Sequence, residues 1–399
     1  MQRIAVVGAG IVGLAVAREA GIRWPDATIT VVEKEASVAH HQTGHNSGVV
    51  HSGLYYTPGS LKATLCTRGV VLLREYCDDH DIEVADCGKV VVATHASEVS
   101  RLEELLARGR ENGVPELRML GPAELGELEP HAAGLRALHS PRTAIVDYRA
   151  VARSLAAEVT ARGGEVLLGT EVVGVRPTRG GGVTLLLDGT EREALECDLL
   201  VTCTGLASDR VAGLAGDGAE PRIVPFRGEY FRLRPQARHL VNGLIYPVPD
   251  PRYPFLGVHL TRTVSGEVLI GPNAVLAFAR EGYRRRTVSP KDLRATLGWP
   301  GFRVLARQHW RTGVAEMYRS VSKRTFLAAA ARYVPELTTD DLEPAPAGVR
   351  AQAVARDGSL VDDFWLSRQG NVLNVRNAPS PAATSSLAIA EHICAELAK

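Results

Sequence analysis

The chain has 399 residues, a formal net charge of +1, 45% hydrophobic residues and 23% charged residues. This composition is that of an ordinary globular protein long enough for two domains, and its near-zero charge gives no electrostatic basis for a nucleic-acid partner. Six cysteines are scattered without a CxxC pair, which favours neither a zinc site nor a disulfide framework and fits a reduced cytoplasmic compartment.

No targeting or membrane-spanning segment is predicted. The first apolar run begins at Arg3, which leaves no room before it for a signal peptide. No run approaches the roughly 18 apolar residues that cross a bilayer. We therefore expect a cytoplasmic protein that is at most peripheral on the inner face of the cell membrane.

The first 33 residues read as a strand, a glycine-rich turn, a helix and a second strand that ends on an acid. Gly8 allows a tight turn, Gly10 lets a pyrophosphate approach the backbone, and Gly13 lets the helix pack closely on the strand. The helix N-terminus favours phosphate, and Glu33 can accept hydrogen bonds from a ribose diol. This pattern predicts a dinucleotide site but does not distinguish NAD from FAD.

After this unit comes a stretch rich in Gly, Ser, His and Asn without clear periodicity, at residues 36–62, which predicts a ligand-contacting loop with one helical turn at 46–51. Helices are then predicted at 61–80, 97–112, 121–128 and 148–161, and strands at 89–94, 135–146, 165–168, 171–176, 183–187 and 197–204.

From residue 221 to 270 the sequence is rich in Pro and aromatic residues, with alternating runs at 229–233 and 255–260, which indicates an antiparallel sheet. Helices at 288–316 and 325–333, strands at 342–355 and 371–375, and a last helix at 380–397 complete the chain.

These elements predict an α/β protein with a discontinuous Rossmann-like nucleotide-binding domain and a smaller α+β substrate domain whose sheet is mainly antiparallel. We assign residues 1–82, 147–218 and 343–399 to the first domain, and residues 83–146 and 219–342 to the second.

Several blocks resemble those of one enzyme family. The first block is T-G-H-N-S-G-V-V-H-S-G-L-Y-Y-T-P-G-S-L-K-A, at 43–63. The others are V-P-F-R-G-E-Y at 224–230, Y-P-V-P-D-P at 246–251, P-F-L-G-V-H-L-T at 254–261, G-P-N-A at 271–274, R-S-V-S-K at 319–323, G-V-R-A-Q at 348–352 and R-N-A-P-S-P-A-A-T-S-S-L-A-I at 376–389. Together with the glycine motif they are similar to the L-2-hydroxyglutarate oxidase/dehydrogenase family of the D-amino-acid-oxidase-like flavoenzymes, over essentially the whole chain.

The resemblance implies that the cofactor is FAD, with its isoalloxazine between the two domains. The glycine motif and Glu33 would hold the adenosine end. The further cofactor-binding residues expected are Gly44, Asn46, Ser47, Val173, Gly205, Pro381, Ala383 and Thr384. The helix opened by Ser380 would point its positive end at the flavin, although an ordinary N-cap with Pro381 at N1 explains the same residues. Without the resemblance, the sequence would predict Val173 only as a residue of the hydrophobic core.

Oxidation of a 2-hydroxy acid needs a cation for the substrate carboxylate and a base for its hydroxyl proton while hydride leaves for flavin N5. Arg350 matches the carboxylate-binding arginine of amino-acid-oxidase relatives, and the alternative is a surface ion pair. For the second carboxylate of a five-carbon diacid the candidates are Arg227 and Lys62. Either can instead be structural, and Arg227 can pair with Glu229.

The base is His259, which we favour as a residue of the substrate sheet, or His51 in the flavin-adjacent loop. Either can be a structural histidine, and His51 also matches a position where some relatives attach flavin covalently. His40, His41 and His45 near His51 have no spacing typical of a zinc site, and no metal is expected.

The resemblance thus implies oxidation of an L-2-hydroxy acid, namely L-2-hydroxyglutarate to 2-oxoglutarate, with electrons passed to quinone, another acceptor or O2. The alternatives are another small substrate on the same scaffold, such as an amino acid or a biosynthetic intermediate, and a non-catalytic flavin-binding protein. Residues 274–286 combine apolar and basic side chains, which suits either peripheral membrane contact or a solvated loop.

Overall fold

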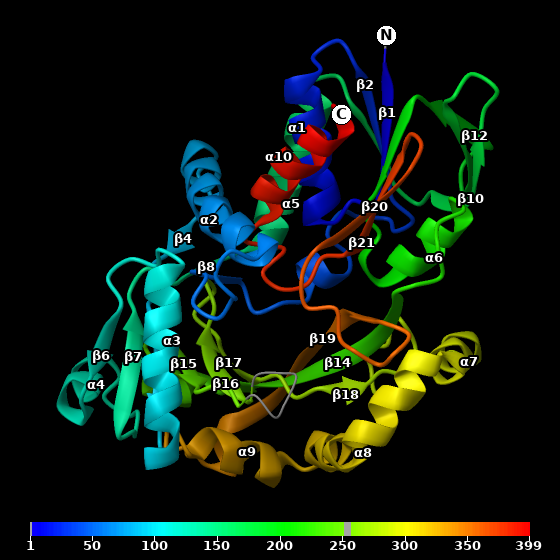
Figure 1. The fold of residues 1–399 in the computed structure, drawn as a ribbon. Coiled ribbons are helices and arrows are strands. Elements are labelled where there is room, and N and C mark those ends of the chain that lie inside the picture. Colours follow the sequence, from blue (N-terminus) through cyan, green and yellow to red (C-terminus); the bar gives the residue numbers. More distant parts are fainter. Residues whose placement is uncertain (1, 251–256) are drawn as a thin grey trace.

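The computed structural model of the chain describes residues 2–250 and 257–399, without the side chains of residues 312, 315, 318, 319 and 321. Two sheets lie one above the other in Figure 1, with loops running between them. The strand predicted at 255–260 and two of the family-like blocks fall partly outside the described residues.

The upper sheet of Figure 1 has six strands in the order β20-β21-β13-β1-β2-β9. All neighbours are parallel except β20 and β21. Its strands are β1 (Arg3–Val7), β2 (Thr28–Val32), β9 (Glu165–Leu167), β13 (Leu199–Thr202), β20 (Trp365–Gln369) and β21 (Val372–Asn377). The predicted Rossmann-like sheet, assembled from distant parts of the chain, is confirmed.

Both faces of this sheet are covered, as parallel sheets require. Ile4 and Val6 pack against the helices α1 (Ile11–Arg23), α5 (Tyr148–Ala161) and α10 (Ser386–Leu397). Ala5 and Val7 pack against the small antiparallel sheet of β10 (Glu171–Pro177), β11 (Val183–Asp188) and β12 (Ala194–Cys197). The period-two alternation of β1 therefore separates two cores.

The lower sheet has nine strands in the order β18-β14-β17-β16-β15-β5-β7-β6, with β19 paired to β14. Its strands are β5 (Lys89–Ala93), β6 (Arg118–Leu120), β7 (Arg136–Ser140), β14 (Arg222–Leu233), β15 (Leu244–Pro247), β16 (His259–Arg262), β17 (Val268–Gly271), β18 (Val275–Leu276) and β19 (Leu342–Val354). Among its described strands, only the neighbours β5 and β15 are parallel. The predicted mainly antiparallel sheet is confirmed.

One predicted domain boundary shifts. Residues 343–354 were assigned to the nucleotide-binding domain, but β19 pairs with β14 from Leu342 to Val354, so this segment belongs to the lower sheet. Long antiparallel pairing fixes the strand there. The boundary that we now propose follows Val354.

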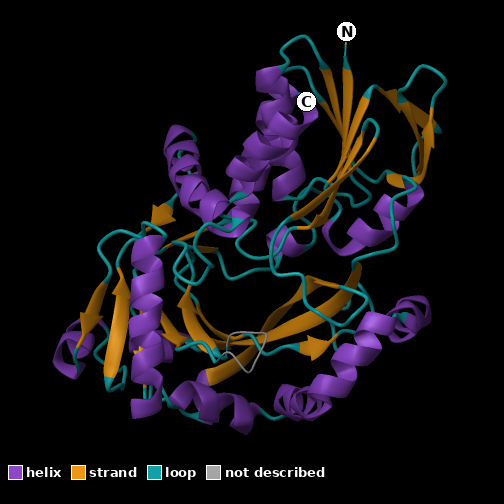
Figure 2. Cartoon of the chain, viewed as in Figure 1, coloured by secondary structure: helices purple, strands orange, loops and turns teal. Residues whose placement is uncertain are grey.

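Helices cover the lower sheet on the side away from the upper domain, where α9 (Lys323–Ala331) and α8 (Pro300–Val321) lie beneath it in Figure 2. Phe326 of α9 packs edge-on against Phe231 of β14. The other helices are α2 (Leu61–Asp79), α3 (Val99–Glu111), α4 (Pro122–Leu128), α6 (Ser208–Leu214) and α7 (Pro290–Gly298). A small sheet of β3 (Val49–Val50), β8 (Ala144–Val146) and β4 (Val84–Ala85) lies beside α2.

Three local predictions differ from the structure. The turn expected at 46–51 is a 3-10 turn at Gln42–Gly44 followed by β3. The helix expected at 288–316 is two helices, because Pro300 lacks an N–H and starts α8 anew after α7. The last helix begins at Ser386, since residues 381–385 form a turn closed by the Ser385 N–H donating to the Pro381 carbonyl at 3.0 Å.

Candidate active site

The glycine turn between β1 and α1 is shaped by three close approaches. Gly8 has φ +105°, in the left-handed region, and a Cβ there would lie 2.5 Å from the Cys203 carbonyl oxygen. A Cβ on Gly13 would lie 1.9 Å from the Gly8 carbonyl oxygen. At Gly10 only Thr43 Oγ1, at 3.4 Å, would come near. Space is therefore open at the one glycine that a pyrophosphate has to approach.

Polar groups around this turn also fit a nucleotide. Gly10 is the N-cap of α1 and supplies no side-chain cap, so the first N–H groups of the helix face outward, apart from the Ile11 N–H, which donates to Thr43 Oγ1. The Glu33 carboxylate at the end of β2 accepts from the Ala9 N–H at 2.7 Å and the Glu35 N–H at 2.9 Å. These bonds hold it beside the turn, where a ribose diol would reach its remaining lone pairs.

The loop residues predicted to bind the cofactor have different structural roles. A Cβ on Gly44 would lie 2.6 Å from Arg149 Nε, so this glycine is needed by the packing of Arg149. Asn46 donates to the carbonyls of Gln42 and Thr43 and accepts from the Gly48 N–H. Ser47 follows it half-buried. Asn46 thus holds the loop in shape and presents Ser47.

Val173 lies on β10 of the small antiparallel sheet, and Gly205 lies in the 3-10 turn after β13. Val173 is 48% exposed and falls at the irregularity where the β10–β11 register skips from Val172 to Gly174, so its main chain is free of the ladder. It is not the core residue that its type suggests. Gly205 follows β13 with φ +48°, and a Cβ there would lie 2.7 Å from Gln42 Oε1.

The turn before α10 brings Pro381, Ala383 and Thr384 against the loop after β3. Thr384 Oγ1 accepts from the His51 N–H at 3.1 Å and lies 2.8 Å from Tyr148 Oη. The hydroxyls of Ser385 and Ser386 are buried without a hydrogen-bond partner among the described residues. The α10 N-terminus therefore holds polar groups that the protein itself leaves unsatisfied, as expected beside a bound cofactor.

His259 opens β16 and is 5% exposed. Its Nδ1 lies 3.0 Å from the Gly257 carbonyl oxygen, which can only accept, so Nδ1 carries the proton and Nε2 keeps its lone pair. Burial, and then the charges of Arg350 and Lys89, lower the pKa of His259 to about 3. The imidazole is therefore neutral at pH 7, with Nε2 available to accept a proton.

His51 lies in the same cluster. Its Nδ1 is buried without a partner among the described residues, and its Nε2 lies 3.4 Å from Ser380 Oγ. Burial first, and then the charges of Lys89, Arg350 and Lys62, lower the pKa of His51 to about 3. The structure thus brings both candidate bases together, between cations from both domains.

Arg350 lies opposite Phe226 in the β14–β19 ladder and is exposed. Arg227, the next residue of β14, is opposite Val349 and so points to the other face of the sheet. There it contacts Glu229, with Nη2 3.0 Å from Oε1. Arg227 is therefore paired with Glu229, which was the alternative to substrate binding. Of these two arginines, Arg350 is the one near the histidines.

Lys62 is buried on α2, and its Nζ lies 2.8 Å from Oδ1 of Asp362. Asp362 is 93% exposed at its side chain, so a competing carboxylate could replace it. Lys62 remains a candidate cation near His51.

Sequence reasoning missed Lys89, the first residue of β5. Lys89 is 1% exposed, and no hydrogen bond or ion pair joins its Nζ to a described residue. Nζ lies 4.6 Å from the ring centroid of Tyr246 and 5.1 Å from that of Tyr55. Burial lowers the pKa of Lys89 to about 8. A lysine in a run of strand residues is a weak signal, because its burial depends on the tertiary packing.

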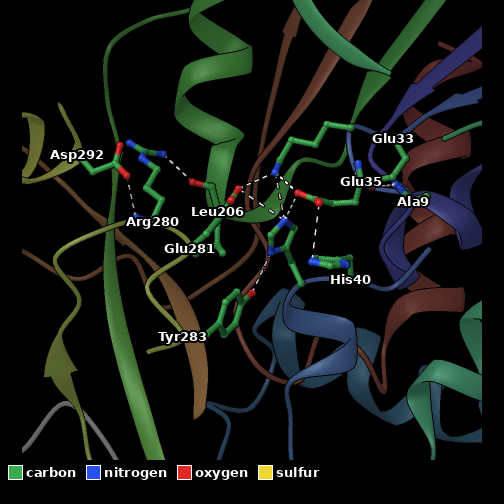
Figure 3. A network of polar contacts seen from close by, with 11 residues as sticks. Ala9, Glu33, Glu35, His40, Leu206, Arg280, Glu281, Tyr283 and Asp292 are labelled. Carbon is green, nitrogen blue, oxygen red and sulfur yellow. Dashed lines mark hydrogen bonds and ion pairs between the residues drawn. The ribbon is translucent and has the colours of Figure 1, made fainter. Parts of the chain in front are cut away.

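A polar network joins the loop after β2 to the segment after β18 (Figure 3). Among the described residues, only Glu35, His41 and Glu281 place potential metal-ligand atoms within 4.8 Å of one another. Lys34 Nζ contacts Glu35, lies 2.7 Å from Glu281 Oε1 and 3.2 Å from His41 Nε2. An ammonium group therefore already occupies the centre of this cluster.

Residues 274–286 fold inward. Val275, Ala277 and Ala279 are buried, Arg280 pairs with Asp209, and Tyr283 stacks on His45 with 4.3 Å between ring centroids. These three apolar residues are therefore not available to a membrane surface. Of the helices that the structure describes, none is both long and apolar enough to cross a bilayer.

Comparison with known proteins decides the family. A model described as FAD dependent oxidoreductase (DAO) matches residues 3–396. L-2-hydroxyglutarate dehydrogenase of Homo sapiens is 48% identical, over 99% of this chain and 88% of the relative, and that of Escherichia coli K12 is 45% identical, over 100% and 93%. The chain belongs to the L-2-hydroxyglutarate dehydrogenase family of FAD-dependent oxidoreductases.

Solved structures agree on the fold of this L-2-hydroxyglutarate dehydrogenase family member. L-alpha-glycerophosphate oxidase from Mycoplasma pneumoniae with FAD bound has a TM-score of 0.80 at 20% identity, covering 100% of this chain and 96% of that one. Glycine oxidase from Geobacillus kaustophilus has a TM-score of 0.74 at 18% identity, covering 100% and 95%. FAD is the cofactor, and the open glycine turn fits it.

Proposed function

We propose that this protein oxidises L-2-hydroxyglutarate to 2-oxoglutarate with FAD, as its relatives' names indicate for them. The observation that carries the proposal is His259, a neutral imidazole whose Nδ1 donates to Gly257 and whose Nε2 carries the lone pair, in one cluster with Arg350. A 2-hydroxy acid needs this combination of a base and a cation. The amino-acid and non-catalytic alternatives are not favoured by any further feature.

His259 Nε2 takes the hydroxyl proton of the substrate, because it is the ring nitrogen that keeps a lone pair when Nδ1 donates to the Gly257 carbonyl. FAD, when bound, supplies the acceptor for the hydride from C2. His51 takes the same role if the substrate hydroxyl lies toward the flavin loop. A bound dicarboxylate adds negative charge beside both histidines, which raises their pKa values from about 3 and makes them better bases.

Arg350 binds the carboxylate next to the reacting carbon. A guanidinium can donate two parallel hydrogen bonds to a carboxylate, which fixes the orientation of C2 as well as its position. The cofactor would be held by Gly8, Gly10 and Gly13 at the pyrophosphate, Glu33 at the ribose, the main chain of Val173 at the adenine, and the turn at 380–384 near the flavin.

The test is anaerobic mixing of the purified holoenzyme with a panel of 2-hydroxy acids of both hands and of amino acids, monitored by flavin absorbance. L-2-Hydroxyglutarate should bleach the flavin band much faster than any other compound, and the product should be 2-oxoglutarate. Bleaching by an amino acid or another hydroxy acid, with none by L-2-hydroxyglutarate, would refute the proposal and leave the fold unaffected.

We propose that the electron acceptor is quinone, another carrier or O2, and that the protein is cytoplasmic. For a membrane quinone, the contact surface that we propose is α8 in place of residues 274–286. Trp310, Val314 and Met317 are 60%, 60% and 51% exposed, at helical spacing on one stripe. Arg307 and Arg311 are exposed beside it, which suits an anionic bilayer surface.

A further inference from the structure

We propose that Lys89 binds the second carboxylate of a dicarboxylic substrate, the one remote from the reacting carbon, and thereby makes the site select diacids over monoacids. This inference rests on the proposed function. It adds the residue that distinguishes a diacid from a monoacid, a role for which sequence reasoning had offered only Arg227 and Lys62.

The first argument is the energetic cost of burying the Lys89 ammonium group without a counter-charge. Its side chain is 1% exposed and no described carboxylate pairs with it. A buried ammonium group without a counter-charge loses its hydration, and the rings of Tyr55 and Tyr246 compensate for only part of that loss. Such a group is retained when a ligand supplies the missing negative charge.

The second argument is position. The charges of Lys89 and Arg350 both act on His51 and on His259. Lys89 comes from β5 and has Cys66, Cys87 and two tyrosine rings as neighbours, whereas Arg350 comes from β19, separated from β5 by several strands of the sheet. The two cations therefore reach the histidines from different sides, as the two ends of a diacid require.

The third argument is the set of unsatisfied polar groups around this end. Tyr55 Oη and His51 Nδ1 are buried without a partner among the described residues. A carboxylate accepts up to about four hydrogen bonds. An anion on Lys89 would satisfy a nearby hydroxyl as well as the ammonium, which an apolar end of a monoacid cannot do.

The other two candidate cations already have carboxylate partners among the described residues. Arg227 is bound to Glu229, which also accepts from Arg285 at 2.9 Å. Lys62 is bound to Asp362 at 2.8 Å. Only Lys89, of these three cations, has no carboxylate partner among the described residues.

The experiment measures binding of glutarate and valerate to the oxidised holoenzyme by titration calorimetry. Neither acid has a hydroxyl group to oxidise, so the result does not depend on turnover. Wild type should bind glutarate at least tenfold more tightly than valerate. Lys89→Met should weaken glutarate binding by about 10- to 100-fold, the loss expected for one charge-assisted contact, and leave valerate binding unchanged.

Lys89→Arg retains the charge and should keep part of the preference. The matched control is Lys291→Met at the exposed start of α7, which should change neither affinity. A structural role is tested separately: without ligand, Lys89→Met should unfold at an equal or higher temperature than wild type, because it removes an unpaired buried charge.

The inference is overturned by equal affinities of wild type for the two acids, by an unchanged preference in Lys89→Met, or by parallel losses for both acids with a lower unfolding temperature. Failure of the proposed function is a different result, namely wild-type flavin that L-2-hydroxyglutarate does not reduce. The wild-type comparison stands even where a variant fails to fold.

Discussion

The imidazole of His259 stacks on the ring of Tyr246, with 4.0 Å between ring centroids and 26° between ring planes. Tyr246 lies on β15, between β16, which carries His259, and β5, which carries Lys89. Three adjacent strands therefore deliver the base, an aromatic ring and a buried cation side by side. Because these residues lie on strands of one sheet and not on loops, the distances between them are held fixed.

His259→Asn should keep the shape of the side chain near Gly257 but remove Nε2. We expect flavin reduction by L-2-hydroxyglutarate to slow by about 10²- to 10⁴-fold, the usual contribution of a general base. Stopped-flow absorbance measures this rate. His51→Asn is the comparison, and a greater loss in that variant than in His259→Asn would assign the base to His51.

Arg350→Met should remove the contact with the substrate carboxylate next to the reacting carbon. Because mono- and diacids share this group, KM should rise for both, by about 10- to 100-fold. Steady-state kinetics with L-2-hydroxyglutarate and a five-carbon L-2-hydroxy monoacid measure the effect. A loss confined to the diacid would mean that the ends are bound the other way round.

Arg227→Met should act on folding and only weakly on substrate affinity. Glu229 would remain buried, but it keeps Arg285, Ser320 and the Asn273 amide as partners, so we expect a loss of about 1–3 kcal/mol in the free energy of unfolding. Urea denaturation provides the measurement. A large rise in KM with unchanged stability would instead restore Arg227 as a substrate ligand.

The stability of the protein should fall as pH decreases from about 6.5 to about 4.5. The pKa values of His51 and His259 are lowered from 6.5 to about 3 by burial, so in this window the unfolded chain binds more protons than the folded one. Each histidine contributes up to about 1.4 kcal/mol per pH unit. Urea denaturation across this pH range should show a smaller fall for the double variant His51→Asn/His259→Asn.

Gly13→Ala should abolish stable FAD binding, because the new Cβ would lie 1.9 Å from the Gly8 carbonyl oxygen and push α1 away from β1. FAD content per chain after gel filtration is the readout. The control is Gly126→Ala, where no atom lies within 4 Å of the new Cβ, so stability should be unchanged or rise by about 1 kcal/mol. A Gly13→Ala protein that retains FAD would contradict the prediction that a side chain at Gly13 cannot be accommodated next to Gly8.

Much of the fold follows from local pattern. The β1–α1–β2 unit, the acid at Glu33 and the alternating strands of the second sheet depend on short-range periodicity, and resemblance supplied the cofactor. The start of α10 could not be predicted, because Ser380 and Pro381 are good helix-start residues that here form a turn held by His51 and Tyr148. Lys89 and the pairing of Arg227 depend on which sheet face is covered, and that is a tertiary fact.

The network in Figure 3 has a consequence for how the protein keeps its cofactor. Lys34 and His41 follow β2, while Glu281 and Tyr283 follow β18 of the other sheet, and their contacts fasten the two sheets together near the adenosine end. The substrate-site residues His51, His259 and Lys89 take no part in these contacts. We therefore expect substrate exchange and FAD release to involve different contacts, so that substrate can exchange while the contacts near the adenosine end stay intact.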